Sequence, residues 1–347
     1  MSESRAHTTS PTDADAFRRA SQETFGELTE PFRRELTLHC YRMIGSVPEA
    51  EDLVQETLLR GWRARASFEG RSSVRAWLYS IATNACLNAL KSRAVRSRML
   101  WEPSQPASTT MPKGAPDTAD AWLEPYPNLD LDLIPDAAPG PDARYEMHEA
   151  VRLAFVAAVQ QLPPRQRAVL LLRDVMGWSA IEAANALGGS VESINSALQR
   201  ARGTLAKLPE GVRLGGRDKL TEDHTALVDR YVTAWESSDL GGFIDLLRAD
   251  AVYRMPPWRQ WYQGRSDIRA FFKRAWAHHG AFRLLPTQAN GQPAFAVYWK
   301  DRTDGEWLAQ SIHVLDIRDG EIVSLTAYVG SLGPKLVPRF QLPSVLA

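Results

Sequence analysis

LPPRQRAVLLLRDVMGWSAIEAANALGGSVESINSALQRARGTL, the stretch from Leu162 to Leu205, decides the fold of one part of this chain. Its early prolines predict the start of a first helix, and Gly188 with Gly189 end a second. Ser190 is a typical N-cap for a third helix. The apolar residues of that helix recur at steps of three and four and share one face: Val191, Ile194, Leu198, Ala201 and Leu205. The pattern predicts a helix-turn-helix, with a plain helical hairpin as the alternative.

The opposite face of the third helix is small and polar. Its residues are Glu192, Ser193, Ser196, Gln199 and Arg200. Such side chains can reach base edges when the second helix of a helix-turn-helix lies in the major groove. The sequence therefore predicts a DNA-binding surface here.

A second amphipathic helix is predicted from Pro48 to Arg63. Its buried stripe is Ala50, Leu53, Val54, Thr57, Leu58 and Gly61. The other face carries carboxylates and one leucine: Asp52, Gln55, Glu56, Leu59 and Arg63. A leucine among carboxylates indicates a protein-docking surface, and a plain solvated face with one stray apolar residue is the alternative.

The next helix, Val74–Lys91, has a polar, aromatic and basic face and follows a short loop, Ser67–Ser73. In that loop, Phe68 and Arg71 could stack on a base or contact phosphate, as proteins do with separated strands. Phe68 and Trp77 are alternatively core residues, and for Trp77 the core is favoured.

The charges of the chain are balanced but segregated. Among 347 residues, 41 are Lys or Arg and 41 are Asp or Glu, which excludes a uniformly basic coat. Between Arg60 and Arg98, nine basic residues stand against Glu69 alone, and between Asp117 and Glu149 nine acidic residues stand against Arg144 alone. Any nucleic-acid site must therefore be a local patch.

Breaks in these patterns divide the chain into units. Residues 15–98 and 145–208 are predicted to be helical domains, joined over 99–144 by an acidic, proline-rich linker. A glycine-rich break at Pro209–Asp218 precedes a mixed α and β unit over 221–331. Within the linker, Trp122–Pro127 has a composition suited to docking on a neighbour, and a locally buried loop is the alternative.

Cysteine usage and hydropathy place the protein in a reducing cytoplasm. Cys40 and Cys86 lie far apart with no metal-ligand spacing, so we expect no disulfide, no metal site and no cofactor. No signal-peptide core or spanning segment is evident, so we expect no membrane partner.

Taken together, residues 15–208 resemble the bacterial sigma factors of the extracytoplasmic-function group. Three motifs carry the resemblance: AEDLVQETLLRGW at 50–62, FEGRSSVRAWLYSIATN at 68–84 and LPPRQRAV at 162–169. The resemblance implies that the first docks on core RNA polymerase and that the second opens and reads the minus-ten promoter element. The helix-turn-helix would read the minus-thirty-five element.

The resemblance also implies residue roles. Polymerase contacts would be Asp52, Gln55 and Glu56, beside Leu59 of the predicted docking surface. Candidates for the melted minus-ten strand are Phe68, Arg71, Thr83, Asn84 and Asn88, of which Asn88 is expected toward the buried edge of its helix. Facing the upstream duplex would be Ser190, Glu192, Ser193, Ser196, Gln199 and Arg200, with Arg165, Arg167 and Arg202 holding phosphates.

The last unit looks like a SnoaL-like fold, a cone-shaped α+β domain that curls a sheet round a pocket. The features that carry this are predicted helices at His224–Trp235 and Asp267–Trp276, the stretch LLRADAV at 246–252, and a hairpin signal at Asp319-Gly320. The expected fold class is therefore multidomain, with two all-α domains, a linker and a C-terminal α+β cone. Some extracytoplasmic-function sigma factors carry such tails.

Two functions follow. The first is a sigma factor that binds core RNA polymerase and promoter DNA and is regulated by its tail. The second is a DNA-binding regulator fused to a cyclase or isomerase with an Asp or His base. His313 and Asp316 could form such a pair, but their opposite strand parity places them on opposite faces, which weakens the enzyme hypothesis. Candidate residues for binding a small molecule or an intramolecular partner are Trp258, Trp261, Tyr262 and His313.

Overall fold

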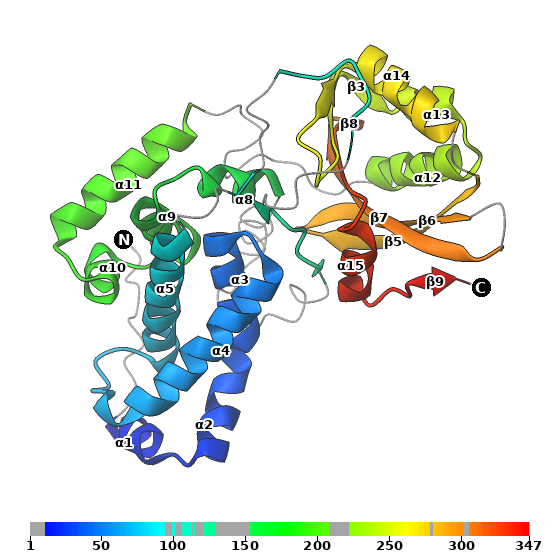
Figure 1. The fold of residues 1–347 in the computed structure, drawn as a ribbon. Coiled ribbons are helices and arrows are strands. Elements are labelled where there is room, and N and C mark those ends of the chain that lie inside the picture. Colours follow the sequence, from blue (N-terminus) through cyan, green and yellow to red (C-terminus); the bar gives the residue numbers. More distant parts are fainter. Residues whose placement is uncertain are drawn as a thin grey trace. The chain divides into compact units, whose positions relative to one another are not determined.

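The chain divides into two compact units. A computed structural model describes residues 11–93, 99–100, 106–112, 114, 121–128, 153–207, 222–277, 280–300 and 305–346. One unit comprises Met1–Arg98 with Asp130–Leu214 and is helical; the other comprises Met99–Leu129 with Gly215–Ala347 and contains the main sheet (Figure 1). Three features of the sequence analysis lie outside the described residues: Arg96 with Arg98, the acidic run Asp117–Glu149 apart from Glu124, and the break Pro209–Asp218.

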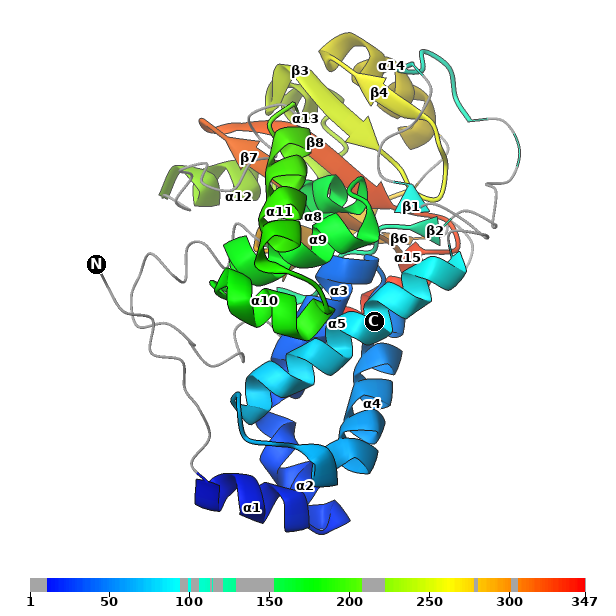
Figure 2. The ribbon, with the colours of Figure 1, turned by 90° about the vertical axis from the view of Figure 1, so that its left-hand side faces the viewer.

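The helical unit begins with a group of helices in which α3, α4 and α5 pack against one another (Figure 2). The helices are α1 (Pro11–Arg19), α2 (Gln22–Thr29), α3 (Arg33–Ile44), α4 (Val47–Ala64) and α5 (Val74–Arg93), with 3-10 turns at Glu30–Phe32 and Arg65–Ser67. Gly45 ends α3 with a φ of 81°, which costs glycine little. The predicted stripe of α4 is buried except for Leu58, which is half-buried.

The helix-turn-helix prediction is confirmed. This part contains α8 (Leu153–Gln160), α9 (Pro164–Leu170), a π-helical turn (Leu171–Val175), α10 (Ala180–Leu187) and α11 (Val191–Leu205). Ser179 caps α10 by accepting a hydrogen bond from the Glu182 N–H, and Ser190 caps α11 through the Ser193 N–H, each at 3.2 Å. The buried face of α11 is Ile194, Ala197, Leu198 and Ala201.

The second unit is built on a curled sheet in the order β4-β3-β8-β7-β6-β5. Its strands are β3 (Leu247–Arg254), β4 (Trp261–Gln263), β5 (Phe282–Ala289), β6 (Gln292–Lys300), β7 (Trp307–Arg318) and β8 (Glu321–Tyr328), with β9 (Val345–Leu346) beside β7. Pairing along this path is antiparallel except between β3 and β8. Asp319 and Gly320, with φ of 51° and 74°, form the predicted hairpin between β7 and β8.

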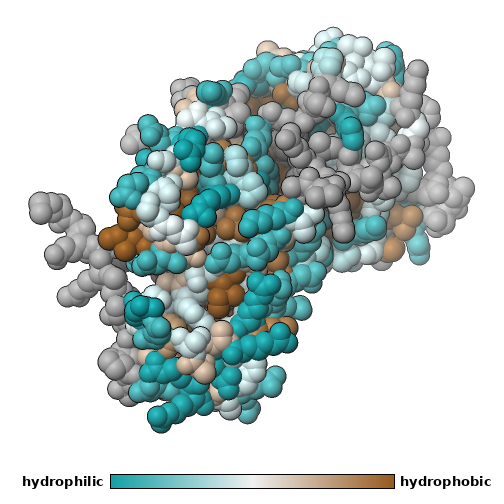
Figure 3. All heavy atoms as spheres, turned by 60° about the vertical axis from the view of Figure 1, so that its left-hand side comes forward, coloured by the Kyte–Doolittle hydropathy of each residue, from teal (hydrophilic) through white to brown (hydrophobic). Residues whose placement is uncertain are grey.

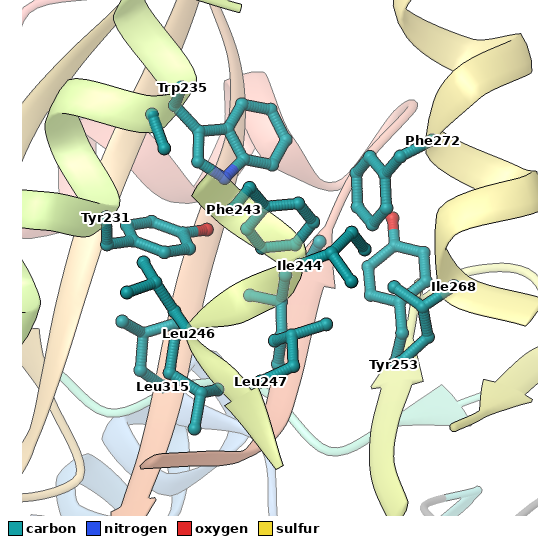
Figure 4. Close-up of a cluster of buried hydrophobic side chains, with 14 of the residues drawn as sticks. Tyr231, Trp235, Phe243, Ile244, Leu246, Leu247, Tyr253, Ile268, Phe272 and Leu315 are labelled. Carbon is teal, nitrogen blue, oxygen red and sulfur yellow. The ribbon is translucent and has the colours of Figure 1, made fainter. Parts of the chain in front are cut away.

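The core of this unit lies between its helices and the sheet. The helices are α12 (Glu222–Glu236), α13 (Leu240–Asp245), α14 (Arg265–Trp276) and α15 (Gly333–Leu336), followed by a 3-10 turn at Val337–Phe340. In Figure 4, Tyr231 and Trp235 of α12, Phe243 of α13 and Phe272 of α14 converge on the sheet. Both predicted tail helices are therefore confirmed, and the 246–252 stretch forms most of β3.

Part of the predicted linker docks on this sheet. β1 (Met99–Leu100) pairs in parallel with β2 (Ala121–Trp122). Leu123 and Tyr126, which follow β2 in the sequence, are each 1% exposed. The Tyr126 N–H donates to the Asn290 side-chain oxygen, and the Asn290 N–H donates to the Tyr126 carbonyl, both at 2.8 Å. The prediction that Trp122–Pro127 docks on a neighbour is confirmed.

The surface is mostly hydrophilic over the face shown in Figure 3, with separate hydrophobic patches. Large apolar side chains that are exposed among the described residues are Leu28, Leu59, Ile181 and Val345. Of the helices that the structure describes, none combines the length and hydropathy needed to cross a membrane.

Candidate functional site

The predicted docking surface on α4 is exposed as a single stripe. Asp52, Gln55, Glu56 and Leu59 all face solvent, opposite the buried residues of the helix. Leu59 is 56% exposed and is one of the few large apolar side chains exposed among the described residues. Glu56 makes an ion pair with Arg60 at 2.6 Å, one turn along. The stripe thus combines carboxylates with an accessible apolar side chain.

Phe68 lies in the core, which corrects its assignment to the melted DNA strand. It is 2% exposed and packs with Phe17 and Trp77 at ring-centroid distances of 5.2 and 5.3 Å. The loop folds over α1, where Arg18 donates to the Phe68 carbonyl at 2.6 Å. The ring cannot stack on a base without leaving this cluster, because its faces are already in contact. Trp77 belongs to the same cluster, as predicted.

Arg71 is the exposed member of this loop. Its side chain is 83% exposed and pairs with the neighbouring Glu69. A surface pair of this kind contributes little to stability, so phosphate could displace it at small cost.

Thr83 is also buried, and its assignment to DNA is wrong. Its hydroxyl donates to the Tyr79 carbonyl at 2.7 Å and lies 2.8 Å from Nε2 of His39. Burial lowers the pKa of His39 to about 3, so the ring is neutral and donates this Nε2–H to Thr83. The side of α5 that carries Thr83 packs on α3.

Asn84 and Asn88 both lie on the exposed side of α5. The expectation that Asn88 lies toward a buried edge is wrong, which makes it more accessible than predicted. The Asn84 amide donates to the Ser80 carbonyl at 2.8 Å and to the Ala186 carbonyl of α10 at 3.0 Å. Tyr79 and Trp178 add an edge-on ring contact at 6.3 Å between the same two parts of the chain. This contact could not be predicted from the sequence, because nothing in one helix indicates its distant neighbour.

Arg167 is buried and does not hold phosphate. It is 5% exposed and donates to the carbonyls of Gln160 and Leu162 at 2.7 and 3.2 Å, and to that of Met43 at the end of α3. Its positive charge therefore satisfies backbone oxygens where α9 meets α3. A guanidinium used in this way is unavailable to DNA.

Arg165 and Arg202 remain on the surface with partners of their own. Arg165 donates to the Gly188 carbonyl at 2.7 Å and so braces the turn of the helix-turn-helix. Arg202 makes a two-pronged pair with Asp174, at 2.9 and 2.6 Å. Either arginine could still reach phosphate, because both are exposed.

The outer face of α11 presents the predicted polar residues. Glu192, Ser196, Gln199 and Arg200 are exposed, whereas the Ser190 side chain is occupied with capping and the Ser193 hydroxyl donates to the Ser190 carbonyl at 2.7 Å. Asn195 lies exposed on the same face and was not foreseen, although its spacing from Glu192 and Gln199 indicates it. The pKa of Glu192 is lowered by hydrogen bonds from its own backbone N–H and from Ser190, so it is a ready acceptor.

The second unit holds an aromatic cavity of about 360 Å³. Its wall includes Trp235, Tyr253, Trp258, Phe272, Trp276 and Trp299 from the helices, strands and loops of the unit. Met111, Pro112 and Gly114 of the linker also line it. Trp258 and His313 are in the wall as predicted, while Trp261 and Tyr262 are not among the lining residues.

Trp261 and Tyr262 instead hold the linker. The Ser108 N–H donates to the Trp261 carbonyl, and the Tyr262 hydroxyl donates to the Thr110 carbonyl, both at 2.7 Å. Trp258 adds a longer hydrogen bond from its indole to the Gly114 carbonyl at 3.4 Å. These residues are docking residues for Ser108, Thr110 and Gly114 of the linker, upstream of the docked Trp122–Pro127.

His313 is a neutral wall residue. Its Nδ1 lies 2.8 Å from the Tyr231 hydroxyl, and burial lowers its pKa to about 3. Asp316 does not line the cavity and pairs with Arg318 at 2.8 Å. The expectation that the two side chains do not share the pocket is confirmed.

Within the described part of the chain, no group of His, Cys, Asp and Glu side chains is arranged to hold a metal ion.

Three parts of the chain match known protein families. Residues 28–96 match the Sigma-70 region 2 family, residues 152–212 match Sigma-70, region 4, and residues 228–325 match the SnoaL-like domain family. The chain is 41% identical to the ECF RNA polymerase sigma factor SigG of Mycobacterium tuberculosis, over 93% of this chain and 85% of that protein.

A second relative has a solved structure. The ECF RNA polymerase sigma factor SigJ of Mycobacterium tuberculosis is 27% identical over 85% of this chain and 88% of that protein. The crystal structure of SigJ shares the fold, with a TM-score of 0.57 at 21% identity over 88% of this chain and 96% of that chain. The chain therefore belongs to the extracytoplasmic-function RNA polymerase sigma factors, alternative sigma factors that direct transcription, and it carries a C-terminal SnoaL-like domain.

Proposed function

We propose that this sigma factor docks on core RNA polymerase through the exposed stripe of α4, reads the upstream promoter element with α11, and is regulated by its C-terminal unit through the linker. Docking, promoter recognition and regulation would all take place in the cytoplasm, where core RNA polymerase acts. One observation carries the regulatory part: the linker between the two helical regions is docked on the C-terminal unit, with Leu123 and Tyr126 buried.

Regulation through the linker follows from its covalent position. The linker joins the helix group α1–α5 to the helix-turn-helix, so its docking restrains how far those parts can separate. Because the docking is intramolecular, weak contacts suffice to bias an open or a closed arrangement. The hydrogen bond from Asn84 to the Ala186 carbonyl is what a closed arrangement would show, because it occupies a residue expected to read DNA.

The aromatic cavity supports binding better than catalysis. Its titratable lining groups include His313, which burial keeps neutral, while Asp316, the carboxylate considered as its catalytic partner, pairs with Arg318 instead. A general base needs a partner positioned to receive or supply the proton. The cyclase or isomerase alternative therefore has less support than a binding role.

Core-polymerase binding by charge-reversed variants tests the docking proposal. Asp52→Lys with Glu56→Lys should lower affinity for core polymerase, since both carboxylates are exposed and their reversal leaves the buried stripe intact. Glu23→Lys with Glu27→Lys, exposed on α2 at the same spacing, is the matched control and should bind normally. Equal affinity of both variants with the unmodified chain would contradict docking through α4.

A further inference from the structure

We propose that Asn195 of α11 reads a base edge, and that Asn195 and Gln199 form a pair of amide side chains that selects two A·T base pairs in the upstream promoter element. This inference rests on the proposed reading of duplex DNA by α11 and gives that reading a base preference.

The middle of the outer face of α11 consists of polar side chains that are free to meet an external partner. All of them are exposed: Asn195, Ser196, Gln199 and Arg200. Their side chains form no hydrogen bond or ion pair with the described part of the chain. Side chains nearer to both ends of the helix are instead engaged in capping or in an ion pair. The donors and acceptors of the middle therefore form one continuous patch.

Helix propensity argues against a plain solvated surface at this patch. Asn195 and Ser196 lie in the interior of α11, where asparagine and serine stabilise a helix less than alanine, lysine or glutamate do. Asn84, which lies in the interior of α5, bonds to two backbone carbonyls of the protein. Asn195 makes no such bond to the described residues, so its side chain is suited to a partner outside the protein.

Charge favours a base edge over a phosphate as the partner of Asn195. Glu192 lies three residues before Asn195, so the two side chains are neighbours on the helix surface. Hydrogen bonds from its own backbone N–H and from Ser190 lower the pKa of Glu192, so its carboxylate is ionised at neutral pH. A phosphate beside this carboxylate would be repelled, whereas the neutral edge of a base would not.

The chemistry of the amide group points to adenine. A side-chain amide holds one donor and one acceptor side by side, which match N7 and the N6 amino group of adenine in the major groove. Guanine presents two acceptors there and cytosine one donor, so the amide pairs fully with neither.

The spacing of the two amides predicts the spacing of the bases. Asn195 and Gln199 are four residues apart, which is a rise of about 6 Å along the helix, against about 3.4 Å between base pairs. With α11 lying along the groove, the two amides reach A·T pairs that have at most one base pair between them.

Selection of binding sites from a pool of random duplexes tests the preference, with the holoenzyme of core RNA polymerase and the full chain. The unmodified chain should enrich two such A·T pairs in the upstream element. Asn195→Arg should change one of them to G·C by about five- to hundredfold, because arginine pairs with O6 and N7 of guanine. Asn195→Ala should lose the preference at that position alone. Both replacements are at an exposed position and leave the buried face of α11 intact.

Asn185→Arg is the matched control for the added charge. Asn185 is exposed on α10, so its replacement should leave the base preference unchanged, whatever it adds to affinity. Circular dichroism confirms folding of each variant. An unchanged preference in folded Asn195→Arg, or the same change to G·C in Asn185→Arg, would overturn this proposal. If Arg200→Ala alters the preference and Asn195→Arg does not, α11 remains the reader; unchanged preferences in both would overturn reading by α11 as well.

Adenine analogues identify the hydrogen bonds to Asn195. In the selected duplex, 7-deazaadenine removes the N7 acceptor, and unsubstituted purine lacks the N6 amino group. Either analogue at the position assigned to Asn195 should weaken binding of the unmodified chain by about three- to tenfold, as loss of one hydrogen bond allows. Neither should weaken binding of Asn195→Ala further. Equal losses in the two proteins would show that another group recognises this adenine and would overturn the role of Asn195.

Discussion

Arg167 and Arg200 are arginines of the same helix-turn-helix region with opposite surroundings. Arg167 is enclosed by backbone carbonyls, whereas Arg200 faces solvent on α11. The sequence pattern assigned both to DNA, because residue type and spacing do not reveal which side of α9 meets α3. At this scale, burial decides whether a cation supports the fold or is free to bind.

Replacing Arg200 by Ala should weaken binding to the specific promoter duplex by about 1–3 kcal/mol if the side chain reads a base edge. Arg165→Ala should instead weaken binding to all sequences alike and lower the salt slope by about one, as loss of a phosphate contact does. Titrations against promoter and scrambled duplexes in holoenzyme would measure both. Equal losses on both duplexes for Arg200→Ala would remove it from base recognition.

Replacing Arg167 by Ala should destabilise the helical unit by about 3 kcal/mol, because several buried carbonyls lose their donor. Arg165→Ala, at an exposed position, should cost less than about 1 kcal/mol. Urea unfolding of the two variants makes the comparison. A stable Arg167→Ala protein with weakened DNA binding would restore the phosphate role that the structure removes.

Acid should destabilise both units through buried histidines. His39 and His313 each have a pKa lowered to about 3 by burial, against about 6.5 in the unfolded chain. The unfolded state therefore binds more protons between these values, so the free energy of unfolding falls as pH drops from about 6.5 toward 3. His39→Gln should flatten this dependence for the helical unit in urea unfolding at several pH values. An equally steep dependence in that variant would exclude His39 as its cause.

Elements differ in how well the sequence predicts them. The α10–α11 turn depends on the Gly188-Gly189 pair and the Ser190 cap, and the β7–β8 hairpin depends on the Asp319-Gly320 pair. These signals are local, and both elements were predicted. The positions of Phe68 and Thr83 depend on which distant helices cover them, α1 and α3, and no local pattern carries that information. Trp258 and His313 line the cavity as predicted, whereas the linker residues in its wall were missed, because docking of the linker depends on no local pattern.

Leu123→Asp should release the linker from the sheet. Leu123 is 1% exposed, and a buried carboxylate there has no partner to offset its lost hydration. The Tyr126 amide, bonded to Asn290, should then exchange quickly, while amides of β6 and β7 stay protected. Thr109→Asp, at an exposed linker position, should leave Tyr126 protected. Protection of Tyr126 in the Leu123→Asp chain would contradict docking by burial.

At the scale of the whole molecule, two units divide the work of this sigma factor. The helical unit carries the α4 stripe and α11, and the C-terminal unit carries the docked linker and the cavity. The sequence predicted two helical domains, a linker and a third unit, whose start is indicated by the glycine-rich break and the change from helical to alternating periodicity. Which unit holds the linker could not be predicted, because it depends on the Asn290 and Tyr262 partners far along the chain.

Run-off transcription by core polymerase on a pool of promoters tests the central claim, that the chain is a promoter-specific initiation factor restrained through its linker by its own C-terminal unit. The full chain and a chain ending before Leu220 would be compared at equal concentration. Both should direct transcription from the same subset of promoters, and the truncated chain should differ in output, because Leu123 and Tyr126 lose the surface that buries them. No promoter-specific transcript from either chain would contradict the initiation role, and identical output from both would contradict the restraint.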